Sequence, residues 1–101
     1  MQYFEILGGT LNKKIELSII VPVYNVEKYL GECLDSILKI KNINYELLII
    51  NDGSPDNSQK IIDEYCKKSN RIKSFIKENG GLSSARNYGL ERASGEYMVC
   101  R

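Results

Sequence analysis

The chain has 101 residues, of which 43% are hydrophobic and 27% charged, and its formal net charge is +1. This length allows one small domain, and the balanced charge gives no electrostatic basis for binding nucleic acid or an anionic membrane. The absence of histidine excludes Ser-His and Cys-His nucleophilic arrangements.

The cysteines and the apolar runs indicate where such a chain would reside. Cys33, Cys66 and Cys100 are far apart and form no Cys-x-x-Cys pair, so a zinc site is not expected. We expect reduced thiols instead. No run approaches the about 20 apolar residues of a membrane-spanning helix, and the first residues lack the pattern of a secretory signal. The sequence therefore predicts a soluble, cytoplasmic protein.

The first predicted elements are a strand and a helix that follow a short extension. Residues 1–14 show no clear hydrophobic period, and we expect them to form an N-terminal extension. Residues 15–24 are an apolar, β-branched run typical of a buried parallel strand, with Pro22 near its end. Apolar residues then recur at three-and-four spacing over residues 26–40, which predicts an amphipathic helix with Asn25 as its N-cap.

The same alternation continues along the rest of the chain. It predicts strands over residues 45–51, 71–77 and 96–100, and helices over residues 58–68 and 82–93. Polar and apolar residues alternate over 71–77, which indicates a half-exposed strand near an edge of the sheet. The order βαβαβαβ predicts an α/β fold, an αβα sandwich with a mainly parallel sheet. We expect the first strand to lie between the second and the last.

Polar residues at the carboxyl ends of the first two strands are the candidates for ligand binding, because ligands of open α/β sheets bind there. Asp52 could accept a hydrogen bond from a ribose or a base N–H, or it could simply form a turn. We favour the binding role for Asp52 and the turn-forming role for Asp56 and Ser58, because Ser58 is better placed to cap the next helix. Tyr24 could stack on a base, or it could be an aromatic residue of the core or its rim. The residue type alone does not distinguish these two roles.

A second candidate segment precedes the last helix. Gly80 and Gly81 come just before it, and Arg86 lies about one turn inside it. Helix N-termini attract phosphate, and arginine adds a bidentate donor. An exposed helix charge is the alternative for Arg86. Neither a Walker loop nor a Gly-x-Gly-x-x-Gly fingerprint is present.

Four motifs in this order resemble the start of a family 2 inverting glycosyltransferase, which uses a nucleotide-diphosphosugar donor. The motifs are Ser18-Ile19-Ile20-Val21-Pro22-Val23-Tyr24-Asn25, Asn51-Asp52-Gly53-Ser54 with Asp56, Asn79-Gly80-Gly81-Leu82-Ser83-Ser84-Ala85-Arg86-Asn87-Tyr88-Gly89, and Gly95-Glu96-Tyr97. The resemblance runs from about Leu17 to Val99. It implies the glycosyltransferase-A fold, with residues 15–101 as the nucleotide-binding half of the domain.

The resemblance also implies a nucleotide site made of seven residues: Pro22, Tyr24, Asn25, Asp52, Gly80, Gly81 and Arg86. Tyr24 would stack on the base, beside Pro22, and Asn25 would turn the chain into the helix. Asp52 would accept a hydrogen bond from the base, and Arg86 would reach toward the base or the phosphates. The two glycines would let their loop close over the nucleotide, which we expect to be a uridine diphosphate sugar.

One departure from the family pattern lies at Cys100-Arg101, where the family has an Asp-x-Asp motif that holds a divalent Mg or Mn ion. The resemblance therefore implies a domain truncated before that motif, with no metal ligand and no general base for the acceptor hydroxyl. We expect such a fragment to bind nucleotide weakly, to be inactive alone and to form a homodimer through an open sheet edge. The alternative is a non-catalytic α/β interaction module.

Overall fold

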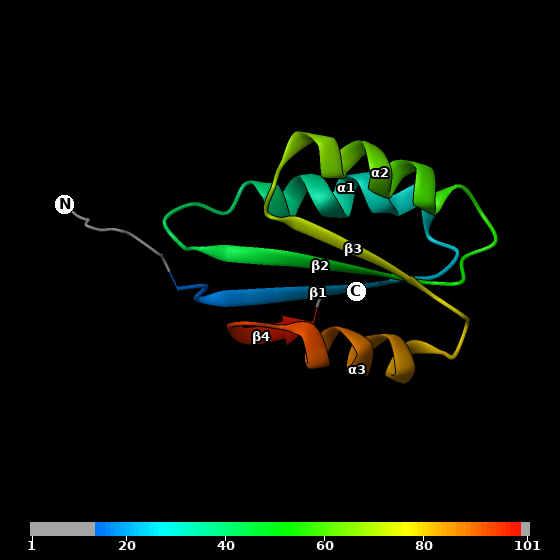
Figure 1. Ribbon diagram of the computed structural model, residues 1–101. Helices are drawn as coiled ribbons and strands as arrows, with labels where there is room; N and C mark the ends of the chain where they lie inside the picture. Colours follow the sequence, from blue (N-terminus) through cyan, green and yellow to red (C-terminus); the bar gives the residue numbers. More distant parts are fainter. Residues whose placement is uncertain (1–13, 100–101) are drawn as a thin grey trace.

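The computed structural model describes residues 14–99, which form three layers, with α1 and α2 on one face of a sheet and α3 on the other (Figure 1). The strands are β1 (Leu17–Val23), β2 (Tyr45–Asp52), β3 (Ile72–Lys77) and β4 (Glu96–Val99), and the helices are α1 (Glu27–Leu38), α2 (Ser58–Lys68) and α3 (Leu82–Arg92). The predicted α/β sandwich is confirmed. Residues 1–13 of the predicted extension, Cys100 and Arg101 lie outside the described residues.

The sheet is parallel throughout and has the strand order β3-β2-β1-β4. β1 therefore lies between β2 and β4, and β3 is an edge strand, as the sequence predicts. The β1–β2 register runs from Leu17 opposite Tyr45 to Val23 opposite Asn51. Because all strands point the same way, the loops that lead into α1, α2 and α3 gather at one edge, on the right in Figure 1.

Both faces of β1 and β2 are buried, which is why their sequences are nearly continuous apolar runs. Odd-numbered positions face α1 and α2, where the larger core lies, and Leu30, Leu34 and Ile62 pack against them. Even-numbered positions face α3, where Ile20 and Leu48 pack near Ala85. The side-chain period of two in a strand produces this division.

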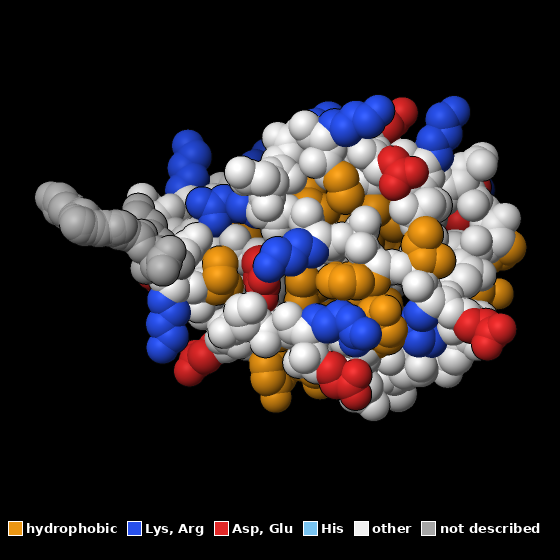
Figure 2. Space-filling model, viewed as in Figure 1, with side chains coloured by type: hydrophobic (Ala, Val, Ile, Leu, Met, Phe, Trp, Pro, Cys, Tyr) orange, Lys and Arg blue, Asp and Glu red, His pale blue; other side chains and the backbone are white. Residues whose placement is uncertain are grey.

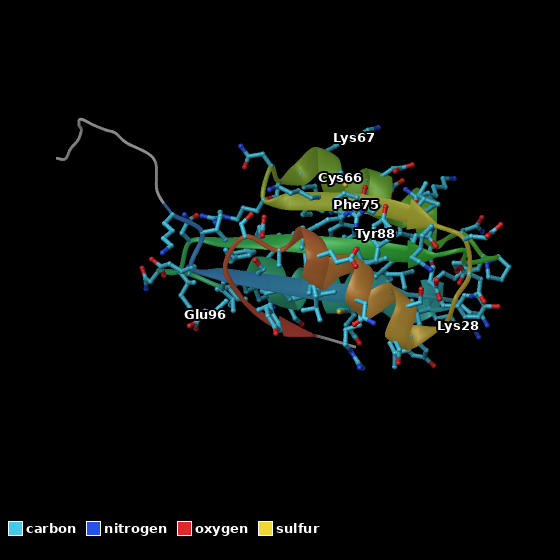
Figure 3. All side chains as sticks on the ribbon, turned by 60° about the horizontal axis from the view of Figure 1, so that its bottom comes forward. Lys28, Cys66, Lys67, Phe75, Tyr88 and Glu96 are labelled. Carbon is cyan, nitrogen blue, oxygen red and sulfur yellow. The ribbon has the colours of Figure 1, made fainter. Side chains whose placement is uncertain are left out.

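α3 approaches the sheet closely because its buried residues are small. Only Ala85 and Gly89 of this helix are fully buried. A Cβ at Gly89 would lie 2.6 Å from Cγ2 of Ile20, so glycine is required there for close packing. Hydrophobic side chains gather between the layers on the face shown in Figure 2, with lysines and arginines around them. At this seam Phe75 and Tyr88 meet edge to face, with ring centroids 5.8 Å apart (Figure 3).

The expected N-cap of α1 is wrong. Asn25 is not the N-cap, because the helix begins at Glu27, Val26 occupies the cap position and no side chain caps it. Asn25 instead takes a left-handed conformation with φ 58°, which turns the chain between β1 and α1. Tyr29 matches the apolar period of the helix, yet it is 68% exposed. The period identifies the helix but does not tell how far the neighbouring layer extends over it.

A buried carboxylate near the start of β2 ties this end of the sheet together. Glu46 accepts hydrogen bonds from Ser18 Oγ at 2.6 Å, the Ser94 backbone N–H at 2.7 Å and Lys73 Nζ at 2.9 Å. Ser18 Oγ in turn accepts a bond from the Gly95 N–H at 2.9 Å. Burial by itself would raise the pKa of Glu46, but these donors outweigh it and lower the pKa below its usual value.

Glu46→Gln should destabilise the fold by about 1–3 kcal/mol near neutral pH, because the neutral amide replaces a charged acceptor. A lowered folded-state pKa gives stability that is present above the unfolded pKa and is lost as the pH falls through the folded value. The difference in free energy of unfolding between wild type and Glu46→Gln should therefore become smaller below about pH 4. Urea unfolding across this range measures it. Glu91→Gln, at an exposed carboxylate, is the control, and a Glu46→Gln gap independent of pH would contradict this account.

Candidate functional site

A groove of about 230 Å³ lies at the carboxyl edge of the sheet, between the β1–α1 loop and the start of α3. It is lined by Pro22, Val23, Tyr24, Val26, Asp52, Leu82 and Ala85. Three of the seven predicted site residues, Pro22, Tyr24 and Asp52, thus line the same groove. Tyr24 is 49% exposed and Leu82 52% exposed, so an apolar surface is open to a flat ligand.

Asp52 ends β2 with its carboxylate buried, and it binds the loop before α3. Oδ1 accepts hydrogen bonds from Lys77 Nζ at 2.9 Å and the Gly80 N–H at 3.0 Å. Oδ2 accepts one from the Gly81 N–H at 2.9 Å and a longer one from Asn79 Nδ2 at 3.4 Å. The structure therefore joins Asp52 to both predicted glycines, although neither glycine lines the groove itself.

The charge of Asp52 is well stabilised. Burial by itself would raise the pKa of this carboxyl, but the hydrogen bonds from Lys77 and the two loop N–H groups outweigh burial and lower it. Asp52 is thus an ionised acceptor near neutral pH, and its four acceptor positions are all engaged within the chain. A base N–H would share or replace one of these bonds.

Gly53 lets the two loops cross directly above Asp52. Its φ is +67°, and a Cβ there would lie 2.8 Å from the backbone N of Asn79. Any larger residue would push the Asn79 loop away, because backbone atoms cannot yield as a flexible side chain does. The close crossing keeps Asn79 near enough to donate to the Asp52 carbonyl at 2.9 Å.

Sequence reasoning missed two participants in this site, Lys77 and Asn79. Lys77 enters the sequence analysis only as one polar position of an edge strand, and Asn79 only as the first residue of a family motif, without a role of its own. The signal for Lys77 was parallel pairing, since β3 aligned with β2 places it opposite Asp52. Its side chain is only 14% exposed and forms an ion pair with Asp52.

A second carboxylate, that of Asp56, joins the β1–α1 and β2–α2 loops. It accepts the N–H of Glu27 at 3.0 Å and the N–H of Ser58 at 3.0 Å, the first residues of α1 and α2. It also accepts the hydroxyl of Ser54, whose Oγ accepts the N–H of Asn25 at 2.8 Å. Burial would raise the pKa of Asp56, but these donors outweigh it and hold the pKa well below its usual range.

These bonds correct the expectation for Ser58. Ser58 is the first residue of α2 and not its cap, and Asn57 stands at the N-cap without a side-chain bond. Asp56 supplies the acceptor for the first turn instead, and it does so for two helices. The predicted turn-forming role of Asp56 before α2 is thus confirmed, and Asp56 also binds the first N–H of α1.

Arg86 is half-buried in the first half of α3. It is absent from the groove lining, and within residues 14–99 it takes part in no ion pair. The structure therefore leaves its role as a prediction.

Three hollows are larger than the groove. One, of about 430 Å³, also lies at the carboxyl edge, and it is lined by Asn25, Glu27, Lys28, Tyr29 and Asp56. The other two, of about 680 and 400 Å³, lie at the amino ends of the strands and share Asn44 and Arg71 in their walls. We do not place the site in the two amino-end hollows, because parallel sheets bind ligands beyond the carboxyl ends of their strands. Figure 3 shows the two ends: Lys28 marks the carboxyl edge and Glu96 the opposite one.

The residues of the structure do not fit a divalent metal. Within the described part of the chain, no group of three or more His, Cys, Asp or Glu side chains could hold an ion. The buried carboxylate in the groove already has four hydrogen-bond donors around it, so we derive no chemical step through a metal. Among residues 14–99, no helix has the length and apolar character needed to cross a membrane.

Comparison with known proteins identifies the family. Residues 18–100 match the family described as Glycosyl transferase family 2, and the chain belongs to this family. It is 48% identical over 82 residues to the uncharacterized glycosyltransferase EpsJ of Bacillus subtilis, covering 81% of this chain and 24% of that protein. It is 49% identical over 86 residues to the minor teichoic acid biosynthesis protein GgaB of the same organism, covering 82% and 10%. The chain thus spans a quarter or less of these relatives.

Solved structures show the same fold. TarS residues 1–349 of S. aureus, in complex with UDP-GlcNAc, superposes with a TM-score of 0.76 at 34% identity, covering 83% of this chain and 25% of that one. Mannosyltransferase PcManGT of Pyrobaculum calidifontis, in complex with GDP-Man and Mn²⁺, superposes with a TM-score of 0.72 at 21% identity. At this identity the likeness shows the fold alone. The expected glycosyltransferase-A fold is confirmed.

Asp52→Ala should cost about 3–5 kcal/mol of folding stability, because it removes the ion-pair partner of the largely buried Lys77 amine, which keeps only its bond to the Glu78 carbonyl. It should also release the loop before α3, so the amides of Gly80 and Gly81 should exchange with solvent faster. Urea unfolding and amide hydrogen exchange measure the two effects. Glu91→Ala, in an exposed ion pair, should change stability by less than about 0.5 kcal/mol. If Asp52→Ala and Glu91→Ala lowered stability equally, the idea that the buried Asp52 carboxylate holds the loop before α3 would be refuted.

Proposed function

We propose that this chain is the nucleotide-binding part of a glycosyltransferase that transfers a sugar from a nucleotide-diphosphosugar to an acceptor hydroxyl. The observation that supports it most is the groove where Tyr24 and Pro22 face the space beside Asp52. An aromatic face and an ionised acceptor in one groove suit a nucleobase, which offers a flat ring and a polar edge. The family of the chain supports the reaction class.

The donor is proposed to be a uridine diphosphate sugar. Support comes from TarS, the neighbour at 34% identity, whose structure contains UDP-GlcNAc. An imide N–H of uracil would donate to the Asp52 carboxylate, and Arg86 would turn toward the phosphates. Asn25 and the two glycines would shape the walls, as the family resemblance implies. The acceptor is proposed to be a cell-envelope polysaccharide, since one relative is named for teichoic acid biosynthesis.

The 101-residue polypeptide is proposed to bind nucleotide weakly and to transfer no sugar when tested alone. Residues 14–99 offer no carboxylate cluster for a cation that could stabilise a departing diphosphate. The proposed compartment is the cytoplasm, and the free, half-buried thiol of Cys66 is consistent with it.

UDP should bind this chain with a dissociation constant of about high micromolar to millimolar, and Arg86→Gln should weaken binding about threefold or more. NMR titration measures both, with wild-type shifts expected at Tyr24 and at the amides of Gly80 and Gly81. Lys67→Gln is the charge-matched control, since Lys67 is exposed in the last turn of α2, far from the groove (Figure 3).

Tight binding that survives both Asp52→Asn and Arg86→Gln would contradict the assignment of the site. No binding of any nucleoside diphosphate would favour the non-catalytic interaction module instead. Sugar transfer or donor hydrolysis by the 101-residue chain would refute the proposed inactivity.

The chain is also proposed to form a homodimer. In the described sheet β4 pairs on one side only, with β1, and Tyr97 on this strand is 60% exposed. Open strand edges pair with other chains, and two-fold dimers are the commonest closed assembly. Sedimentation at micromolar concentration should show a species of twice 11.5 kDa. A single species at the monomer mass would contradict the dimer.

A further inference from the structure

We propose that Ser54 and Asp56 are positioning residues, which hold the two loops of the nucleotide groove in one relative position. This inference rests on the proposed nucleotide site and adds two residues to it. Neither residue lines the groove. Both act through Tyr24 and Asp52, which carry the contacts proposed for the base.

The sheet itself does not hold these two contact residues together. The β1–β2 ladder ends with Val23 opposite Asn51. Tyr24 and Asp52 are the next residues along each strand, beyond the last paired positions. Asp52 is fixed from the other side by its pairing with β3 and its bonds to the α3 loop. Tyr24 belongs to an exposed turn, so its position depends on what holds that turn.

Ser54 and Asp56 supply that tie across the gap. The N–H of Asn25, directly after Tyr24, donates to Ser54 Oγ at 2.8 Å, and the N–H of Glu27 donates to Asp56 Oδ2 at 3.0 Å. Ser54 is held in turn by its hydroxyl bond to Asp56 and by its own N–H, which donates to Asn51 Oδ1 at 2.9 Å. The turn after Tyr24 is thus hydrogen-bonded at two points to the loop after Asp52.

These bonds also act on the backbone of the turn. Asn25 has φ 58°, in the left-handed region, which asparagine adopts more readily than other residues that carry a Cβ. A bond to its N–H helps to hold that conformation, and with it the direction in which the Tyr24 ring leaves the chain. The charge of Asp56 also lies at the N-termini of both α1 and α2, where a negative charge is favoured.

An ordinary helix cap would produce similar bonds but would affect stability alone. The two roles differ in where the effect appears. A cap lowers the free energy of unfolding and leaves the groove unchanged once the chain is folded. A positioning residue also lowers nucleotide affinity, because binding must then order a turn that was previously fixed.

The test compares Ser54→Ala and Asp56→Asn with wild type, using UDP as the probe and NMR titration as the readout. We expect affinity to fall about five- to tenfold in each folded variant, since ordering one loop on binding carries a cost of this size. Amide exchange at Asn25 should become faster in both variants. Ser54→Thr keeps the hydroxyl and should restore affinity and protection.

Tyr65→Phe is the matched control. The Tyr65 hydroxyl donates to Asp35 Oδ1 at 2.8 Å and also lies 3.1 Å from the Gly31 carbonyl, so it ties α2 to α1 about two turns away from Ser58. Its loss should lower stability and leave UDP affinity unchanged. Ser54→Ala behaving in the same way, with unchanged exchange at Asn25, would overturn the proposal.

The inference and the proposed function fail separately. If wild type binds no UDP, the proposed function fails. The exchange rates of the Asn25 and Glu27 amides still decide whether the two residues hold the turn. Unchanged rates in both variants would overturn the positioning role whether or not nucleotide binds.

Discussion

Two buried carboxylates at the ends of β2 hold one layer of this protein to the sheet. Asp52 accepts the N–H groups of Gly80 and Gly81 before α3, and Glu46 accepts the N–H of Ser94 after it. Each carboxylate also pairs with a lysine of β3. α3 buries little apolar side chain, since only Ala85 and Gly89 are fully covered. Polar clamps at both ends therefore supplement what the small apolar contact contributes.

This arrangement links the stability of the fold to the proposed site. The clamp at Asp52 lies in the groove, whereas the clamp at Glu46 lies at the opposite end of the strand. The base contact proposed above would use the oxygens of the first clamp. The second is remote from the groove and anchors the entry to β4. One strand thus carries a buried carboxylate at the groove and another at the opposite end of the sheet.

The carboxyl edge of the sheet also shows how one charge can serve several elements. Asp56 provides the first hydrogen-bond acceptor for α1 and α2 and connects the loops that carry Tyr24 and Asp52. Membership of glycosyltransferase family 2 and the fold shared with TarS agree with a nucleotide-sugar donor at this edge. In the proposed positioning role, the loop geometry that Asp56 supports matters to the groove as well as the residues that line it.

The sequence by itself determined the order of strands and helices, the parallel sheet and the position of Asp52 at a strand end, because hydrophobic period and turn residues are local signals. It could not determine which donors surround Asp52. Lys77 and Asn79 are 25 and 27 residues away in the chain and meet it only through strand pairing and loop crossing. Capping of α1 was likewise misjudged, because Asp56 reaches Glu27 across 29 residues. Contacts between distant segments exist only once the layers have packed, so tertiary structure alone decided them.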